Sequence, residues 1–222
     1  MFKEIYSALT SENTLDQAFD ELTQMLEHGA WMFDRANGVI SSTVDAEEVK
    51  DALYSRDRAI NDLERSIRRK VMRHLTINPG HDVAIALALM SVAKDAERIG
   101  DYCKNVFEVG TFYTEGFRSE KYRDALEDMA DRIHDLFGIL ALAAKHSDEK
   151  KADKVIKQVQ GVRTECDSLI VDLLNDEQNM EFHEAVAYSL LARHYKRVAS
   201  HLANVATAVT GNLVELDFYP ED

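Results

Sequence analysis

The sequence predicts an all-α protein made of two tandem antiparallel three-helix bundles that are related by an internal repeat. Three observations favour this fold: helix-breaking residues are scarce, long stretches carry apolar residues at helical spacing, and the two halves resemble each other. Only two prolines and nine glycines occur in 222 residues, and no stretch shows the apolar–polar alternation of hairpin strands. Helices of roughly 27–34 residues would be about 40–50 Å long, which suits antiparallel bundles with short connections.

We expect three helices in the first half of the chain, over residues 11–40, 43–75 and about 82–115. The second opens with the cap-like Thr43 and ends in the basic run 68–74, which suits the negative end of a helix dipole. Pro79 and Gly80 then break the chain. The apolar stripes expected to face the core are Leu15, Phe19, Leu22, Met25 and Leu26 in the first helix and Ile85, Leu89, Val92, Ala96, Ile99, Cys103 and Val106 in the third.

We expect three further helices in the second half, over residues 120–146, 147–174 and about 180–212. Ser147 is the predicted cap of the middle one. The acidic end of the chain, residues 215–222, is predicted to be a loose tail. The stripe predicted for the first of these helices is Ala125, Met129, Ile133, Leu136, Leu140 and Ala144.

The two halves align when the chain is shifted by 99 positions, which places residues 86–106 against residues 185–205. Six residues then face identical ones: Ala86, Ala88, Ala93, Arg98, Asn105 and Val106. An ordered match of this kind indicates a duplicated unit. The predicted domains are therefore a first bundle over residues 1–116 and a second over residues 117–222, which carries the acidic tail.

Composition argues against nucleic-acid-binding, membrane-bound and secreted proteins. The formal net charge of −14 repels nucleic acid and anionic lipid. The longest uncharged apolar run, residues 83–93, is far shorter than the roughly 20 residues of a membrane span, and the first residues lack the apolar core of a secretory leader. Cys103 and Cys166 lie in apolar helical patterns, which favours two buried thiols over a disulfide. We expect a cytoplasmic protein.

An acidic pair on the third expected helix is the first candidate site. Glu97 and Asp101 are four residues apart, so they share one helix face at the edge of the apolar stripe. Antiparallel helices that turn near residues 78 and 43 bring Asp57, Glu27 and His28 to a similar height. Oxygen ligands with one imidazole suit iron, manganese, zinc or magnesium. These five residues are the predicted metal ligands.

The alternative interpretation of the same face is a set of ion pairs. Lys94 lies three residues before Glu97 and Lys104 three residues after Asp101, so each carboxylate has a cationic neighbour on its own helix. In the second repeat, Lys196 stands at the position of Glu97, and an ammonium group cannot ligate a metal. We therefore expect no second metal site.

The stretch AERIGDYCKNVFE (96–108) closely resembles the third-helix motif of PhoU-type phosphate regulators, in which three residues separate a Glu or Asp from a following Asp, as they separate Glu97 from Asp101 here. The segments RDRAINDLERSI, NPGHD and LLARHYKRVASHLANVATAV follow the order of that family. The resemblance covers nearly the whole chain. It implies two three-helix bundles, multinuclear iron or zinc clusters on the bundle surface, and homodimerisation. It also implies negative control of phosphate uptake and signalling through contact with a phosphate transporter and a sensor histidine kinase.

Three functions remain open from the sequence. The first is a non-catalytic regulator of phosphate transport, since no nucleophile–base set or Gly-rich phosphate loop is visible. The second is an accessory protein of a low-affinity or sodium-coupled phosphate transporter. The third, from another class, is a metal-dependent oxidoreductase, but di-iron bundles need inward Glu-x-x-His pairs that "LEHG" and "EFHE" do not supply. Partners would be proteins, with membrane contact only through them.

A basic cluster on the last expected helix also has two interpretations. Arg193, Lys196, Arg197 and His201 recur at helical spacing and could attract an anion such as phosphate. The alternative is an ordinary solvated face of a surface helix.

Overall fold

The computed structural model describes residues 12–175, 180–216 and 218, and every regular element in this part of the chain is helical. The all-α prediction is therefore confirmed. The expected acidic tail lies mostly outside the described residues. The long helices are α2 (Glu12–Ile40), α3 (Ala46–Ile77), α4 (Val83–Phe112), α5 (Glu120–His146), α6 (Glu149–Leu174) and α7 (Phe182–Val209), followed by the short 3₁₀ helix η1 (Leu213–Glu215).

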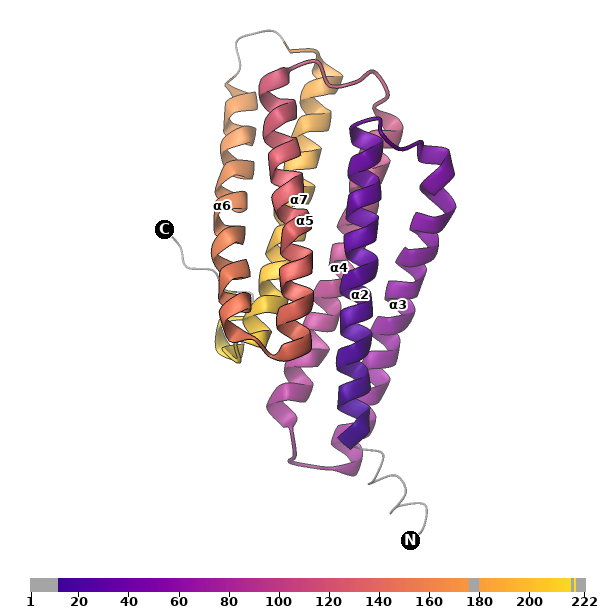
Figure 1. Cartoon of the computed structure of the whole chain (residues 1–222), viewed down its shortest axis with the longest axis vertical. Coiled ribbons are helices and arrows are strands. Elements are labelled where there is room, and N and C mark those ends of the chain that lie inside the picture. Colours follow the sequence, from indigo (N-terminus) through magenta and orange to yellow (C-terminus); the bar gives the residue numbers. More distant parts are fainter. Residues whose placement is uncertain (1–11, 176–179, 217, 219–222) are drawn as a thin grey trace.

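The six long helices form two antiparallel bundles that stand side by side, α2–α4 and α5–α7 (Figure 1). Helices α2, α4, α5 and α7 form the shared centre, because α2 packs on both α4 and α5 and α7 packs on the same two helices. Helices α3 and α6 lie on the outer flanks. The linker 113–119 joins the bundles. The prediction of two tandem three-helix bundles is confirmed.

Carboxylates cap two of the helices, and here the sequence interpretation was wrong. Asp45 accepts a hydrogen bond from the Glu47 amide (2.8 Å) at the start of α3, in place of the predicted Thr43. Asp148 accepts one from the Lys151 amide (3.1 Å) at the start of α6. Ser147, the predicted cap, instead ends α5 in the left-handed conformation with φ of 49°.

The apolar stripes are buried as predicted except near helix ends. Phe19 and Ile85 are exposed, and both line a pocket at one end of the first bundle. On α5 the buried stripe begins at Tyr122 and continues at Leu126, so the predicted Ala125 is exposed. The other predicted stripe residues, apart from the half-buried Ala144, belong to one core that runs through both bundles.

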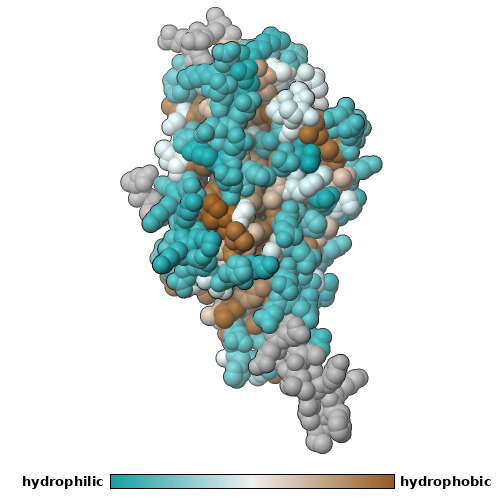
Figure 2. All heavy atoms as spheres, viewed as in Figure 1, coloured by the Kyte–Doolittle hydropathy of each residue, from teal (hydrophilic) through white to brown (hydrophobic). Residues whose placement is uncertain are grey.

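Aromatic rings join the bundles at the level of the α2–α5 contact. The Phe33 ring lies 5.9 Å from the Phe137 ring and 5.5 Å from the Tyr195 ring, so side chains from α2, α5 and α7 meet. Figure 2 shows hydrophobic side chains along the middle of this face, between hydrophilic flanks. Burial of these rings in one continuous core fixes the bundles against each other.

The linker between the bundles is fastened by a buried carboxylate. Glu184, in the first turn of α7, accepts hydrogen bonds from the amides of Arg118 (2.6 Å) and Ser119 (3.0 Å). The Tyr188 hydroxyl donates to the Ser119 carbonyl oxygen (3.0 Å). Two donors on one buried carboxylate satisfy its charge without water, so the linker holds a fixed path between α4 and α5.

Both cysteines are free and buried, as expected from their apolar surroundings. Burial raises the pKa of the Cys166 thiol to about 12 and also raises the pKa of Cys103. Within the described residues, none of the helices combines the length and apolar character that a bilayer span requires.

Candidate functional site

The acidic pair of α4 lies beside lysines. The Glu97 carboxylate is nearly buried and lies 2.5 Å from Lys94 Nζ. Asp101 lies 3.1 Å from Lys104 Nζ, and the same ammonium lies 3.2 Å from Asp57 on α3. The structure thus brings together Asp57 and Asp101, as the antiparallel register predicted, but with an ammonium group between them.

Lys104 is held in its charged form by this arrangement. Partial burial alone would lower the pKa of its ammonium group, but hydrogen bonds to Asp101 and Asp57 outweigh burial and raise that pKa. A protonated lysine occupies the place between two carboxylates that a cation would take. Within the described residues, no group of three or more His, Cys, Asp or Glu side chains is placed to hold a metal ion. In this arrangement the side chains do not fit a metal cluster.

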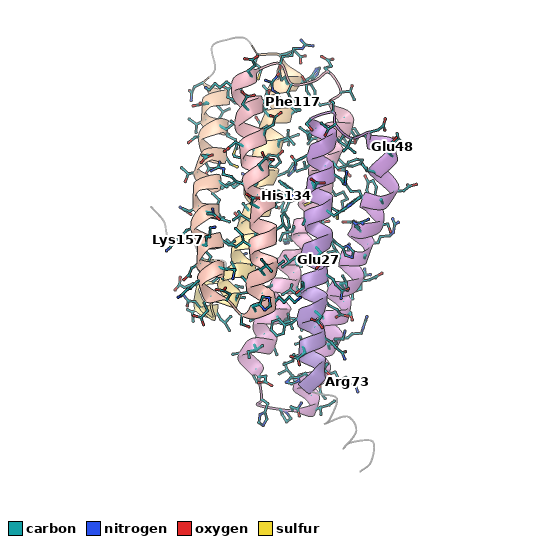
Figure 3. The ribbon with its side chains drawn as sticks, in the orientation of Figure 1. Glu27, Glu48, Arg73, Phe117, His134 and Lys157 are labelled. Carbon is teal, nitrogen blue, oxygen red and sulfur yellow. The ribbon has the colours of Figure 1, made fainter. Side chains whose placement is uncertain are left out.

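The other two predicted ligands, Glu27 and His28, lie on α2. Figure 3 shows Glu27 on α2, in front of α4, and its side chain is exposed. His28 is half-buried; burial lowers its pKa, and the nearby Arg56 guanidinium lowers it further against the opposing effect of Glu27. Arg56 also stacks over the Trp31 ring at 3.7 Å. His28 thus has a guanidinium group as well as a carboxylate in its surroundings.

The second repeat carries an ion pair at the equivalent position. Lys196 of α7 binds both carboxylate oxygens of Asp167 on α6, at 2.6 and 2.5 Å. Ser200 donates a hydrogen bond to the Lys196 carbonyl oxygen (2.8 Å) within α7. Where the first repeat has an acidic helix face, the second repeat thus has a lysine–aspartate ion pair between α6 and α7.

A polar cluster between α4 and α7 was missed by the sequence interpretation. Asp95 is buried, and its Oδ1 lies 2.8 Å from His201 Nδ1 and 2.7 Å from Asn204 Nδ2. The Tyr102 ring stacks on His201 at 5.7 Å and lies 5.9 Å from the His194 ring. Asp95 is thus satisfied by the other bundle.

The repeat contained the signal that would have located this cluster. Under the shift of 99 positions, Asp95 corresponds to His194 and Tyr102 corresponds to His201. The contact of Asp95 with His201 and the contact of Tyr102 with His194 are therefore equivalent: superposing one repeat on the other places each contact on the other. A two-fold pseudo-symmetry axis passes between α4 and α7, which run antiparallel. The duplicated helices meet each other at this axis.

His194 has an unusual environment within the cluster. Its Nδ1 atom is buried and has no hydrogen-bond partner in the described part of the chain. Burial lowers the pKa of His194, and the neighbouring Arg193 lowers it further, while Glu108 acts in the opposite direction. Desolvation and a like charge both disfavour the imidazolium form, so the ring stays neutral to a lower pH than a solvated histidine does.

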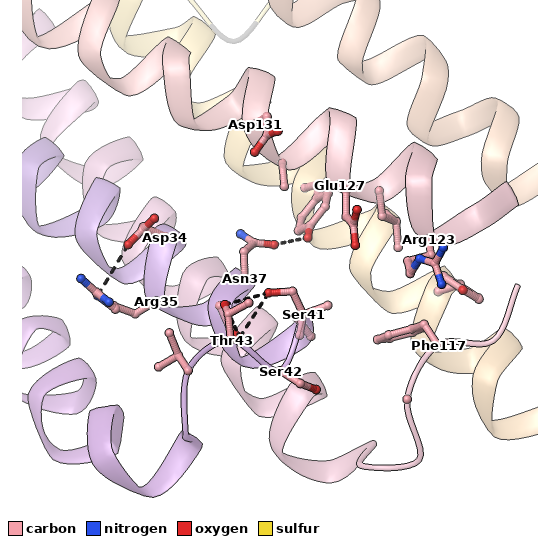
Figure 4. Close-up of a pocket in the computed structure, with 18 residues that line it drawn as sticks. Asp34, Arg35, Asn37, Ser41, Ser42, Thr43, Phe117, Arg123, Glu127 and Asp131 are labelled. Carbon is pink, nitrogen blue, oxygen red and sulfur yellow. Dashed lines mark hydrogen bonds and ion pairs between the residues drawn. The ribbon is translucent and has the colours of Figure 1, made fainter. Parts of the chain in front are cut away.

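A cavity of about 800 Å³ opens between α2 and α5 near the linker (Figure 4). Within it, the Tyr195 hydroxyl donates a hydrogen bond to Asn37, and Arg35 pairs with Asp34 at 3.5 Å. Charges of both signs line the cavity, three acidic and two basic. Its charged lining residues are Asp34, Arg35, Arg123, Glu127 and Asp131.

The arrangement described so far is that of two duplicated three-helix units, each with its third helix at a shared centre. The sequence model described as "PhoU domain" matches the chain twice, over residues 22–109 and 126–209. The chain belongs to the PhoU family. The two matches coincide with α2–α4 and α5–α7, so each bundle is one PhoU unit.

Relatives with assigned names support this membership along most of the chain. A "Phosphate-specific transport system accessory protein PhoU homolog" from Xylella fastidiosa is 24% identical over 201 residues, which cover 89% of this chain and 84% of the relative. The protein of the same name from Synechocystis is 22% identical over 158 residues, covering 69% of this chain and 70% of the relative.

Solved PhoU structures share the fold of this PhoU-family chain. PhoU from Pseudomonas aeruginosa superposes with a TM-score of 0.81 at 18% identity, covering 93% of this chain and 98% of that one. The phosphate transport system regulatory protein PhoU from Streptococcus pneumoniae gives 0.72 at 19% identity, with coverages of 91% and 96%. The arrangement of both bundles is therefore common to these proteins.

Proposed function

We propose that this PhoU-family protein is a non-catalytic regulator of phosphate uptake and phosphate-responsive signalling. It would act on the cytoplasmic side as an adaptor that contacts a phosphate transporter, a sensor histidine kinase, or both. The observation that carries the proposal is the double match to the PhoU domain. The names of the relatives, which describe accessory proteins of phosphate-specific transport, support it.

The chemistry of the surface is compatible with an adaptor. The acidic groups of α4 are engaged by Lys94 and Lys104, and Asp95 is engaged by the second bundle. Such groups stabilise the helices and are not poised to transfer protons to a substrate. Long rigid helices, in contrast, present extended faces that suit protein contacts.

Two finer versions of the proposal share the same fold. The transporter could be an ATP-driven system, as the names of the relatives suggest, or a low-affinity or sodium-coupled one. A homodimer, expected from the family resemblance, is compatible with either. The metal site predicted from the sequence at Glu97, Asp101, Asp57, Glu27 and His28 is the alternative to the ion pairs of Lys94 and Lys104, and the metal content of the protein decides between the two.

Co-purification tests the proposal directly. The tagged full-length protein is recovered from detergent-solubilised membranes of its source cells, grown with high and with low phosphate. We expect a phosphate transporter, its kinase, or both to be recovered, and the identity of the transporter selects between the two versions. Recovery of metal or redox proteins alone, together with oxygen consumption by the iron-loaded protein, would instead support the oxidoreductase alternative.

A further inference from the structure

An exposed face of α4 and α7, on the side of these helices away from α2 and α5, combines apolar and basic side chains. Helices α4 and α7 lie behind α2 and α5 in Figure 1. We call this face the α4–α7 strip. Its residues are Val83, Leu87, Arg98 and Phe112 of α4 and Phe182, Val186, Leu190, Arg193 and Arg197 of α7.

One end of the strip is an apolar groove of about 410 Å³ beside the linker. Phe112 of α4 and Phe182, Val186 and Leu190 of α7 line it. The two phenylalanine side chains are 83% and 73% exposed, which is costly in water unless a partner covers them. Of the two acids near its rim, Glu115 is paired with Arg118 at 3.3 Å, and Glu181 lies 3.2 Å from the His183 ring.

The opposite end of the strip is also apolar, because the repeat places similar residues there. Val83 and Leu87 of α4 correspond to Phe182 and Val186 under the shift of 99 positions. Leu87 is 58% exposed. From Leu87 to Phe112 the strip is about 38 Å long at 1.5 Å per helical residue.

The middle of the strip is basic. Positions 182, 186, 190, 193 and 197 follow one another at spacings of four and three, so Arg193 and Arg197 continue the groove's face along α7. Arg98 corresponds to Arg197 in the repeat. The stack of Tyr102 against His194 and His201 sets α4 and α7 in register, so Arg98 and Arg197 lie at the same height.

These three arginines differ from the lysines of the same helices. Lys94, Lys104 and Lys196 each pair with a carboxylate of this chain. Arg98, Arg193 and Arg197 are exposed, and none forms an ion pair within the described residues, although the chain has 40 acidic residues and 26 basic ones. Guanidinium groups bind carboxylates in a bidentate manner and are enriched at protein interfaces.

We infer that the α4–α7 strip docks an elongated amphipathic protein segment, with carboxylates near its middle and apolar side chains toward its ends. The inference rests on the proposed adaptor function and names the surface through which it acts. A second copy of this chain fits poorly, because a two-fold contact centred on the strip would set Arg98, Arg193 and Arg197 against their own counterparts. Carboxylates of a partner would instead neutralise them and fix the register.

Charge reversal tests the basic middle. The full-length tagged variant Arg98→Glu/Arg197→Glu is compared with Arg58→Glu/Arg69→Glu, which makes the same change in charge at exposed positions of α3. We expect the first variant to lose recovery of the transporter or kinase by at least about tenfold, and the control to retain it within about twofold. Leu190→Asp and Leu142→Asp form the matched apolar pair, since both side chains are exposed.

Photo-crosslinking identifies the occupant. A benzophenone amino acid at position 190 should join the protein to a segment of the transporter or kinase that carries carboxylates, whereas position 142 should not. Replacing those carboxylates by lysine should restore binding to the Arg98→Glu/Arg197→Glu variant. Equal recovery by all variants, or a crosslink mainly to a second copy or to a basic segment, overturns the inference while the adaptor function stands. If the wild-type protein recovers neither transporter nor kinase, the proposed function fails and the docking surface fails with it.

Discussion

Asp95 and His201 meet across the boundary between the two bundles, with Asp95 Oδ1 2.8 Å from His201 Nδ1. Asn204 donates a second hydrogen bond to the same carboxylate oxygen. The pseudo-symmetry axis relates this contact to that of Tyr102 with His194. The centre of the α4–α7 interface is therefore polar, in contrast to the aromatic contact of Phe33 with Phe137 on the other side.

Removal of the Asp95 carboxylate should weaken the whole fold. Asp95→Ala leaves His201 and Asn204 without their buried acceptor, which costs about 1–3 kcal/mol in the free energy of unfolding. Asp51→Ala is the matched control, because Asp51 is exposed on α3 and the change in helix propensity is the same. Urea unfolding of the full chain measures both. A loss equal to that of the control would show that the two bundles do not depend on this contact.

The direct contribution of the pair can be separated by a double-mutant cycle. Asp95→Ala, His201→Ala and the double variant should give a coupling free energy of about 0.5–3 kcal/mol, as expected for residues in one hydrogen-bonded network. Additive losses would assign the stability to Asn204 and to the surrounding packing instead.

The fold was predictable because its signals are local and repeated. Apolar residues at helical spacing located the long helices, and the match between residues 86–106 and 185–205 gave the duplication. The errors arose where the local pattern is ambiguous. Asp45 and Asp148 lie within two residues of equally plausible caps, and tertiary packing decides how far a stripe such as that of Ile85 is covered.

The candidate site was predictable only in part. The antiparallel register correctly placed Asp57 beside Asp101, since both lie on helices joined by a short turn. The partners of Asp95 lie more than 100 residues away along the chain, so spacing along one helix could not reveal them. The antiparallel register predicts Glu27 at the height of Glu97 and Asp101. Its side chain, however, is exposed on α2, in front of α4.

The two interpretations of Glu97 and Asp101, as metal ligands or as members of ion pairs, predict different metal contents for the purified protein. Because Lys94 and Lys104 engage these carboxylates, we expect the protein loaded with iron(II), zinc or manganese and then desalted to retain less than about one ion per chain. Glu97→Ala/Asp101→Ala should retain the same amount. Elemental analysis gives the readout, and Glu48→Ala/Asp51→Ala on α3 is the control. Stoichiometric metal that is lost only in the α4 variant would establish the site predicted from the sequence.

His194 should make stability depend on pH. Burial and Arg193 lower its pKa in the folded protein, so the unfolded chain binds a proton at a higher pH than the folded chain does. The unfolded state then holds more protons, and stability is lost as the pH falls from about 7 through the normal histidine range. His28, whose pKa is also lowered, adds to the same slope. His194→Phe should flatten the slope between about pH 7 and pH 5.5 in urea unfolding.

An NMR titration checks whether His194 causes this pH dependence of the free energy of unfolding. The imidazole signal of His194 should titrate below the usual value of about 6.5. A normal or raised value would mean that the ring is solvated or paired, and the slope would then need another origin.

Substitutions at two glycines should change the free energy of unfolding in opposite directions, because only one of these glycines lies where helices meet. A Cβ atom at Gly29 would lie 3.1 Å from Ile99 Cγ2 on α4 and 3.3 Å from Phe137 Cε1 on α5, so α2 touches both bundles there. Gly29→Val overfills this contact and should cost about 1–3 kcal/mol. A Cβ atom at Gly161 meets nothing within 4 Å in the middle of α6, so Gly161→Ala should add about 0.5–1 kcal/mol through helix propensity.

Thermal and urea unfolding of the two variants distinguish a shared core from two independent bundles. If the bundles unfold together, Gly29→Val and Gly161→Ala shift a single transition in opposite directions, although they lie in different PhoU units. If the bundles were independent, each change would move only one of two transitions. The Phe33–Phe137 and Asp95–His201 contacts connect the bundles through both an apolar and a polar interface, and the buried apolar residues of both bundles form one core. A single transition is therefore the expected result.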